Sequence, residues 1–350
     1  MAMTQVYINA IATAVPNHDV HQKFIDYCPR LLSNPKLSAI FSRIAQRTQI
    51  EHRYSFFKPH EAADKLDAAD FYKLEKFPST QQRMVLYENY SFRLAQRALD
   101  QLDLENITHL IITSCTGFYA PGLDYQIIQH YGLSANIERS MVGFMGCYAA
   151  INALKLARHI VRSESNARVL MVNIELCTLH LKPAQTLEEI LPFLIFSDGC
   201  AASVLSSSPS GLEVINFKST FLPGTEELIT WRIGDLGFDM NLSGQVPGVI
   251  AAQLPLYIDK ILDGCTRRDI THWAVHPGGR TILDAVRDGL QLGEEKMMPA
   301  RTVLREYGNM SSATVMFVLK EMLIGDQSGE GCAIAFGPGL SVESMRFRCN

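Results

Sequence analysis

Short apolar runs alternate with longer stretches of helical periodicity along most of this chain. The apolar runs are rich in β-branched residues and predict strands at residues 6–13, 108–115, 168–176, 201–207, 212–220, 271–276 and 332–337. Between them, apolar positions recur at helical spacing and predict helices at residues 81–102, 123–131, 147–162, 247–262, 280–290 and 311–322. Because the strand runs are continuously apolar, we expect strands buried on both faces and covered by helices, which is an α/β layered architecture.

A polar turn cluster, Ser-Ser-Ser-Pro-Ser-Gly, separates two of the predicted strands at residues 206–211. It is the strongest linker signal in the chain. We therefore expect two domains, an N-terminal one at residues 1–208 and a C-terminal one at residues 209–350.

Composition narrows the class of protein. The net charge is -4, from 32 basic and 36 acidic residues that are mixed along the sequence, which argues against a nucleic-acid partner. Neither a signal-like leader nor an uninterrupted apolar run of about 18 residues is present, so we expect no membrane span and a cytoplasmic protein. The 8 cysteines are scattered without a Cys-x-x-Cys pair, which predicts neither disulfides nor a metal site.

One cysteine, Cys147, lies directly after a glycine and directly before a predicted helix, in the segment GFMGCYAA. Backbone N–H groups and the helix dipole favour an anion at such a junction, so we expect a lowered thiol pKa and a reactive thiolate. On these local features alone, a small residue that merely fills a tight contact between strand and helix is the better explanation.

Two polar residues at similar junctions complete a possible catalytic set. His276 ends a predicted strand in HPGGRTILDAV, and Asn309 precedes a predicted helix in YGNMSSATVMFVLK. Each has a plain structural explanation, a satisfied buried histidine and a helix N-cap. Together with Cys147 they supply a nucleophile, a proton-transfer partner and an amide donor. Another Gly-rich turn, AFGPGL, follows the last predicted strand.

These segments, in this order, resemble the type III polyketide synthases of the chalcone and stilbene synthase family. The resemblance extends to SCTGFYAPGLDYQ, RVLMVNIEL and FSDGCAA and covers the chain from about residue 40 to its end. It implies a thiolase-like fold, with two similar α/β halves packed as a five-layer αβαβα sandwich, in a homodimer. It also implies iterative decarboxylative condensation of malonyl-CoA with an acyl-CoA starter, followed by cyclisation, without a metal or redox cofactor.

The resemblance assigns roles to individual residues. Cys147, as a thiolate paired with a His276 imidazolium, would carry the growing chain, and His276 and Asn309 would donate hydrogen bonds to the malonyl-CoA thioester carbonyl. Phe196 matches an aromatic residue beside the malonyl carboxylate. A further set would bind CoA, with the phosphates on one helix face and the pantetheine arm along two glycines: Arg43, Arg47, Gly278 and Gly279.

Five positions that would line the cavity depart from the plant enzymes: Cys115, Cys177, His180, Trp231 and Met240. The bulk of Trp231 argues against an aromatic starter. A bulky aromatic residue at this position resembles the bacterial members of the family. Cys115 and Cys177 are equally well explained by packing. The starter and the product, whether a pyrone, resorcinol, phloroglucinol or naphthalene, stay open. The alternatives are a ketoacyl-acyl carrier protein synthase III or hydroxymethylglutaryl-CoA synthase, a Cys-dependent thioester hydrolase, and an inactive relative.

Overall fold

The computed structural model describes residues 4–32, 34–73, 76–184, 186–325 and 327–349. Its main sheet has the strand order β11-β12-β13-β8-β1-β7-β6-β4-β5. The strands of this sheet are β1 (Tyr7–Ala14), β4 (His109–Ser114), β5 (Glu138–Gly143), β6 (Val169–Leu176), β7 (Asp198–Ser206), β8 (Leu212–Phe221), β11 (Ile270–Val275), β12 (Gly329–Gly337) and β13 (Ser341–Cys349).

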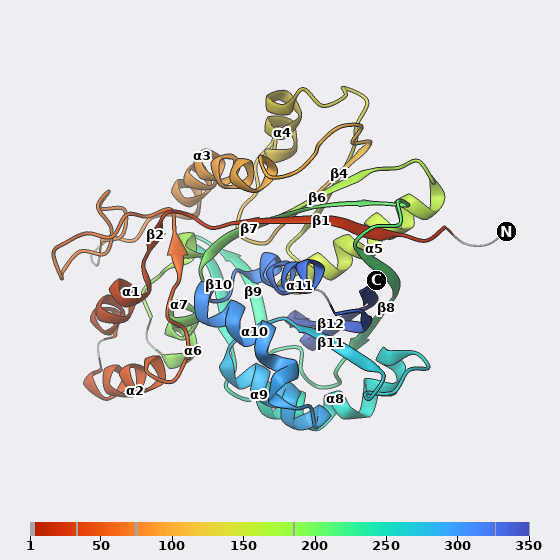
Figure 1. Ribbon diagram of the computed structural model, residues 1–350. Coiled ribbons are helices and arrows are strands. Elements are labelled where there is room, and N and C mark those ends of the chain that lie inside the picture. Colours follow the sequence, from red (N-terminus) through yellow and green to blue (C-terminus); the bar gives the residue numbers. More distant parts are fainter. Residues whose placement is uncertain (1–3, 33, 74–75, 185, 326, 350) are drawn as a thin grey trace.

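The sheet consists of two halves that meet at β1 and β8, where Tyr7 pairs with Glu213 and Ile8 with Leu212. The first half is made by β1, β7, β6, β4 and β5, and the second by β8, β13, β12 and β11. The halves turn away from each other at this short junction and form separate layers (Figure 1). The polar turn at residues 206–211 leads from β7, the last strand of the first half, into β8.

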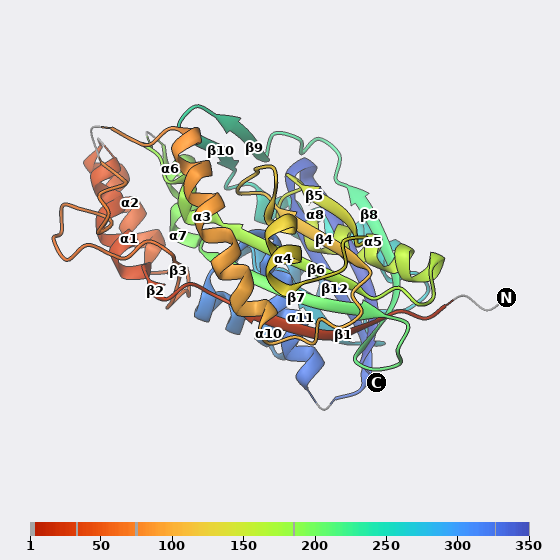
Figure 2. The ribbon, with the colours of Figure 1, turned by 90° about the horizontal axis from the view of Figure 1, so that it is seen from above.

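Helices fill the space between the two sheet halves and cover their outer faces (Figures 1 and 2). Helices α5 (Ala149–Ser163) and α11 (Thr314–Ile324) form the central layer, and α3 (Thr80–Leu99) and α4 (Leu123–Tyr131) cover the first half. Helices α8 (Val246–Leu262), α9 (Arg280–Leu290) and α10 (Glu294–Tyr307) cover the second half. The layers therefore follow the order αβαβα.

The remaining elements lie at one end of the layers, as Figure 1 shows. They are α1 (His21–Tyr27), α2 (Pro35–Ala45), α6 (Leu187–Ile190), α7 (Pro192–Ile195) and the short ribbons β2 (His18–Asp19) with β3 (Tyr54–Ser55) and β9 (Ile229–Gly234) with β10 (Gly237–Leu242). Short 3-10 turns are η1 (Cys28–Leu31), η2 (Cys177–His180), η3 (Ser311–Ala313) and η4 (Pro338–Leu340).

The apolar runs account for the buried strands. Every residue of β4 and β6 is buried, as expected for strands covered by helices on both faces. Helix α5 likewise buries much of its surface, because Ala149, Ala150 and Ala153 allow close approach of the sheets on either side. All seven predicted strands and six predicted helices are present, with ends that differ by a few residues.

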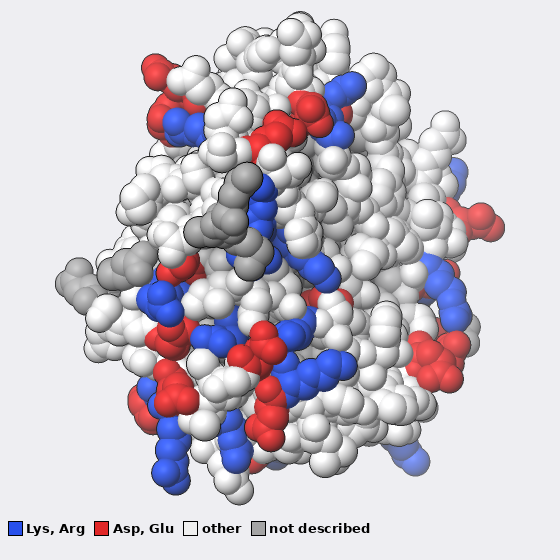
Figure 3. Space-filling view, turned by 90° about the vertical axis from the view of Figure 1, so that its right-hand side faces the viewer, with Lys and Arg blue, Asp and Glu red and all other residues white. Residues whose placement is uncertain are grey.

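The charged surface agrees with the mixed charges of the sequence. On the face in Figure 3, acidic and basic side chains lie interspersed and form no block of one sign. Within the described part of the chain, no helix is both long enough and apolar enough to cross a lipid bilayer.

Candidate active site

A cavity of about 420 Å³ opens among segments from both halves of the molecule, and most of its wall is apolar. Its volume lies in the usual range for small-molecule sites. Four residues that the sequence predicted as catalytic line this one cavity: Cys147, Phe196, His276 and Asn309.

Cys147 lies in the turn between β5 and α5. The preceding residue, Gly146, has φ +85°, and a Cβ atom there would lie 2.5 Å from Cδ of Pro338 in the AFGPGL turn. Only glycine fits both the backbone conformation and the space. The turn at residues 338–340 and Gly146 thus fix the backbone that presents the thiol to the cavity.

Burial controls the protonation of the Cys147 thiol. It raises the thiol pKa to about 12, although hydrogen bonding with the Ser311 and Asn309 side chains acts in the opposite direction. The Sγ–Oγ distance to Ser311 is 3.8 Å. The predicted lowering of the thiol pKa is therefore wrong for the unliganded site, because the surrounding protein excludes water from the sulfur and this burial outweighs the hydrogen bonds that favour the thiolate.

His276 follows the last residue of β11 and is 1% exposed. Its backbone N–H donates to the Ile334 carbonyl at 2.8 Å, which fixes the residue beside β12. Among the described residues, neither ring nitrogen of His276 has a hydrogen-bond partner. Burial lowers the pKa of His276 to about 3, so the ring is neutral and keeps one donor and one acceptor for a ligand.

Asn309 is held by its backbone and by its amide oxygen. Its N–H donates to the Ile195 carbonyl at 2.8 Å, and its carbonyl accepts from the Ser197 N–H at 2.9 Å. The side-chain oxygen accepts from the Ser311 N–H at 2.8 Å and from the Thr314 hydroxyl at 3.3 Å. These contacts commit the oxygen, so the amide nitrogen is the donor; one of its hydrogens is directed to the Gly278 carbonyl at 3.3 Å, and the amide has a second hydrogen for a ligand.

Phe196 lies next to Asn309 because their backbones form a parallel β-bridge. Its carbonyl accepts from the buried guanidinium of Arg53 at 3.1 Å, and Arg53 also donates to the Phe193 carbonyl. The ring therefore stands on the cavity wall beside the amide donor.

A buried carboxyl group that the sequence analysis did not identify connects the two halves beneath the cavity. Glu175 accepts hydrogen bonds from the Cys115 N–H at 2.9 Å, from the Thr116 hydroxyl at 2.8 Å and from the Ser312 hydroxyl. Burial raises the pKa of Glu175 to about 7. A single acidic residue inside the apolar run RVLMVNIEL was the signal that could have revealed it.

The five predicted wall positions all line the cavity: Cys115, Cys177, His180, Trp231 and Met240. Trp231 and Met240 are cross-strand partners on the β9–β10 ribbon, and the Trp231 indole N–H donates to the Cys115 carbonyl at 2.8 Å. His180 lies 2.8 Å from the Thr116 carbonyl through Nε2 and accepts from the Phe238 N–H at 3.0 Å through Nδ1. Because both nitrogens are bonded, His180 has a structural role.

The predicted CoA-binding residues are only partly brought together. Arg47, Gly278 and Gly279 line the cavity, but Arg43 is not among its lining residues. The two arginines do not share a helix, because α2 ends at Ala45 and the Arg47 N–H bonds three residues back to the Ile44 carbonyl. Two further basic residues line the cavity, Lys182 and Arg280. Arg280 opens α9 directly after the two glycines and could have been recognised from the HPGGR motif.

Comparison with known proteins covers the whole chain. The model of the N-terminal domain of the chalcone and stilbene synthases matches residues 1–209, and that of the C-terminal domain matches residues 213–349. The alpha-pyrone synthesis polyketide synthase-like protein Pks18 of Mycobacterium tuberculosis is 34% identical to this chain, over 98% of it and 91% of the relative.

Solved structures agree with the layered fold. The crystal structure of PKS-I from the brown alga Ectocarpus siliculosus has a TM-score of 0.87 and 29% identity, with 100% of both chains covered. The type III polyketide synthase domain of Steely1 from Dictyostelium has a TM-score of 0.90 and 24% identity, over 98% of this chain and 99% of that one. The structure of CsyB complexed with CoA-SH has a TM-score of 0.86 and 22% identity, over 99% of this chain and 100% of that one. The αβαβα layers are thus those of the thiolase-like fold that the resemblance implied.

Proposed function

The chain belongs to the chalcone and stilbene synthase family and is a type III polyketide synthase, and from this premise we propose that it extends an acyl-CoA starter on Cys147 and releases an α-pyrone. The observation that carries the proposal is that Cys147, His276 and Asn309 line one apolar cavity in which the imidazole nitrogens have no partner among the described residues.

In the loading step, the Cys147 thiol passes its proton to the neutral imidazole of His276 and attacks the starter thioester. Burial disfavours a lone thiolate or a lone imidazolium, but proton transfer creates both together, so that each charge stabilises the other. The carbonyl collapses back, the CoA thiolate leaves, and it takes the proton from His276. The products are an acylated Cys147 and free CoA.

In the extension step, the Asn309 amide and the His276 ring donate hydrogen bonds to the thioester carbonyl of malonyl-CoA. Loss of carbon dioxide leaves an enolate, whose charge these donors stabilise; loss of one such donor commonly costs on the order of 100-fold in rate. The enolate carbon attacks the acyl carbonyl, the Cys147 thiolate leaves, and the chain must return to Cys147 before the next extension. Phe196 supplies an apolar wall beside the malonyl carboxylate. This wall favours conversion of the charged carboxylate into neutral carbon dioxide.

The name of the mycobacterial relative, which refers to alpha-pyrone synthesis, supports the same product class here. After two extensions the bound chain carries two keto groups beyond its thioester. The enol oxygen of the distal keto group attacks the CoA thioester carbonyl, a six-membered lactone forms, and the CoA thiolate leaves and takes up the enol proton. The apolar wall around Trp231 and Met240 suits an aliphatic starter.

CoA thioesters would enter past the basic residues of the cavity lining. Arg47 and Arg280 carry the guanidinium groups suited to the phosphates, and Gly278 and Gly279 stand between Arg280 and the catalytic histidine. Gly279 has φ +157°, and a Cβ atom placed there would meet no atom within 4 Å, so a pantetheine arm has room beside it.

The proposed dimer would form at the open edge of the first sheet half. Strand β5 pairs with β4 on one side, and its first four residues, Glu138 to Met141, are exposed. Met141 is 50% exposed there, and an unpaired edge with an exposed apolar residue suits pairing with a second copy. We expect Met141→Glu to reduce the mass measured by light scattering from dimer to monomer, whereas Met298→Glu, at a similarly exposed methionine on α10, should not.

The reaction is tested by incubating the protein with malonyl-CoA and a panel of acyl-CoA starters, followed by mass spectrometry of the products and measurement of carbon dioxide. We expect triketide pyrones from the wild type, no extended product from Cys147→Ala, and about 100-fold slower decarboxylation in Asn309→Ala. Cys265→Ala is the matched control, because Cys265 is partly accessible but absent from the cavity lining. Extended product from Cys147→Ala would refute the assignment of the nucleophile.

A further inference from the structure

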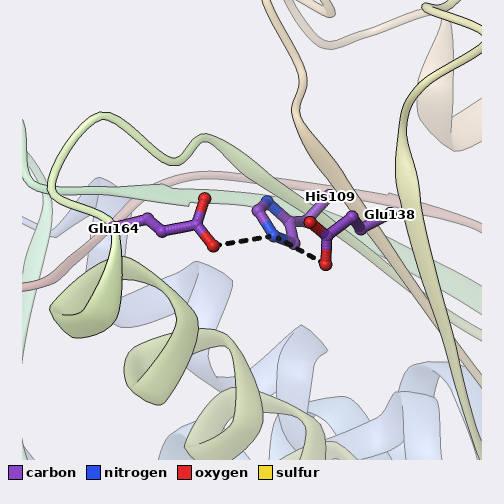
Figure 4. Close-up of side chains that lie close together, drawn as sticks. All are labelled: His109, Glu138 and Glu164. Carbon is purple, nitrogen blue, oxygen red and sulfur yellow. Dashed lines mark ion pairs between the residues drawn. The ribbon is translucent and has the colours of Figure 1, made fainter.

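Three potential metal ligands converge at the far end of the first sheet half, outside the residues that line the cavity. They are His109, Glu138 and Glu164, and their ligand atoms all lie within 4.8 Å of one another. Figure 4 shows the imidazole of His109 between the two carboxylates. Its Nε2 atom lies 3.6 Å from Glu138 Oε2 and 3.9 Å from Glu164 Oε1.

The fold dictates this convergence. His109 and Glu138 are the first residues of the parallel neighbours β4 and β5 and are partners in register, so their side chains project from the same face of the sheet. Helix α5 packs across that face and ends at Ser163, which places the C-cap residue Glu164 beside them. The three ligands therefore come from three elements that are fixed by the core.

The hydrogen bonds of the His109 ring leave Nε2 free. The hydroxyl oxygen of Thr108 accepts from the Arg168 N–H at 3.0 Å and donates its proton to the Arg168 carbonyl at 3.2 Å. The same oxygen lies 2.8 Å from His109 Nδ1 and accepts from that nitrogen in the tautomer that carries its proton there. In that tautomer the Nε2 lone pair points at two carboxylates, and their separations exceed hydrogen-bond length.

Nearby arginines are committed to other carboxylates. Arg139 pairs with Asp124 at 3.0 Å, and Arg168 pairs with Asp103 at 2.8 Å. The His109 side chain is only 6% exposed, whereas Glu138 and Glu164 are 73% and 52% exposed and can rotate toward a cation. A buried nitrogen lone pair facing two mobile carboxylates is an arrangement that a divalent cation would stabilise.

We propose that His109, Glu138 and Glu164 form a divalent-metal site of the zinc class, with water in the open coordination position. One imidazole and two carboxylates are suitable ligands for Zn²⁺, and tetrahedral coordination at about 2.1 Å requires ligand atoms roughly 3.4 Å apart, close to the distances observed. The site lies at the start of β4, while Cys115 of the cavity wall follows the end of that strand, roughly 20 Å away. The metal would tie the starts of β4 and β5 to the end of α5.

The test is a calorimetric titration of the untagged, chelator-treated protein with Zn²⁺, together with the absorption spectrum of the Co²⁺ form. We expect one equivalent to bind per chain, with a cobalt spectrum that lacks the intense charge-transfer band of thiolate ligands. Glu138→Gln and Glu164→Gln should each weaken Zn²⁺ binding at least about tenfold. Glu226→Gln, at an exposed glutamate in the loop between β8 and β9, should bind like the wild type.

Both test substitutions lie at exposed positions, so the folded state is expected to persist, and circular dichroism of each variant verifies it. Absence of saturable Zn²⁺ binding by the wild type would overturn the proposal. So would unchanged affinity in both Glu138→Gln and Glu164→Gln, or a thiolate band in the cobalt spectrum, which would place the metal on cysteines instead.

Discussion

Replacing Arg53 by Met tests how the cavity wall is held. Arg53 is 0% exposed, and its Nε donates to His21 Nδ1 at 2.9 Å while Nη1 donates to the Phe193 and Phe196 carbonyls. Burial lowers the pKa of Arg53 to about 10, so the guanidinium is still charged at neutral pH. The substitution removes the donor from three buried acceptors at once.

The expected loss of stability follows from those acceptors. At about 1–2 kcal/mol for each unpaired acceptor, the gross cost is about 3–6 kcal/mol. Among the described residues no ion pair is formed by the Arg53 guanidinium, so removing this buried cation offsets part of the cost, and we expect a net loss of about 2–4 kcal/mol. For a chain of 350 residues, an unfolding entropy of about 2.1 cal/mol/K per residue converts this into a fall in Tm of about 3–5 °C.

The variant should also lose activity at temperatures where it is fully folded. Phe196 and Asn309 share a β-bridge, so a loosened Phe196 carbonyl displaces the amide donor, and we expect kcat to fall at least about tenfold. Calorimetry and malonyl-CoA turnover measure the two effects, with Arg268→Met, at an exposed arginine absent from the cavity lining, as control. A variant that melts within about 1 °C of the wild type and keeps its kcat would refute the reasoning.

Three further outcomes are expected. His276→Gln should shift the pH profile of Cys147 alkylation by iodoacetamide to higher pH, because the variant lacks the imidazole that takes the thiol proton, and identical pH profiles in variant and wild type would contradict the proposed pair. Burial lowers the pKa of His180 to about 3, so the folded chain excludes a proton that the unfolded chain binds below about pH 6.5, and stability falls with acid from there toward pH 3. His180→Gln should therefore reduce the slope of unfolding free energy against pH by up to about 1.4 kcal/mol per pH unit, as denaturation at pH 5 and pH 7 measures; an unchanged slope would exclude this linkage. Trp231→Ala should raise kcat/KM for a bulkier acyl starter at least about tenfold, judged by product mass against a Trp231→Phe control, and an unchanged starter preference would show that this side chain does not limit the cavity.

Hydrophobic patterning predicted the buried layers well because the buried positions of those strands and helices are occupied by apolar residues. The pattern failed where polar side chains enter an element. Strand β13 contains Glu343 and Arg346, which are 5% and 8% exposed and are compensated by Ser219 and Glu330, so the run did not look like a core strand. The edge strand β5 is largely exposed, and α10 carries Pro299 inside it. Whether β13, β5 and α10 form depends on contacts with residues that are distant in the sequence, and a local pattern does not contain these contacts.

The site was predicted to the extent that its residues occur in recognisable segments. Cys147, His276 and Asn309 each stand at the end of an element, and the fold brings all three to one cavity. The protonation of Cys147 was not predicted, since it depends on how much protein surrounds the sulfur. Glu175 and Arg53 were missed because their importance comes from partners that are distant in the sequence, such as Ser312 at a separation of 137 residues from Glu175 and Phe196 at 143 residues from Arg53.

The division of the cavity between the two halves also bears on synthesis of the chain. Cys147 leaves the ribosome ahead of His276, which follows 129 residues later (276 minus 147). At a translation rate of about 5–20 residues per second, His276 is added to the chain roughly 6–26 s after Cys147. An unfinished chain therefore contains the proposed nucleophile but not its proposed base, and a prematurely terminated one never obtains that base. If the two act as proposed, the order of the halves along the chain by itself delays reaction with thioesters until translation has reached the second half.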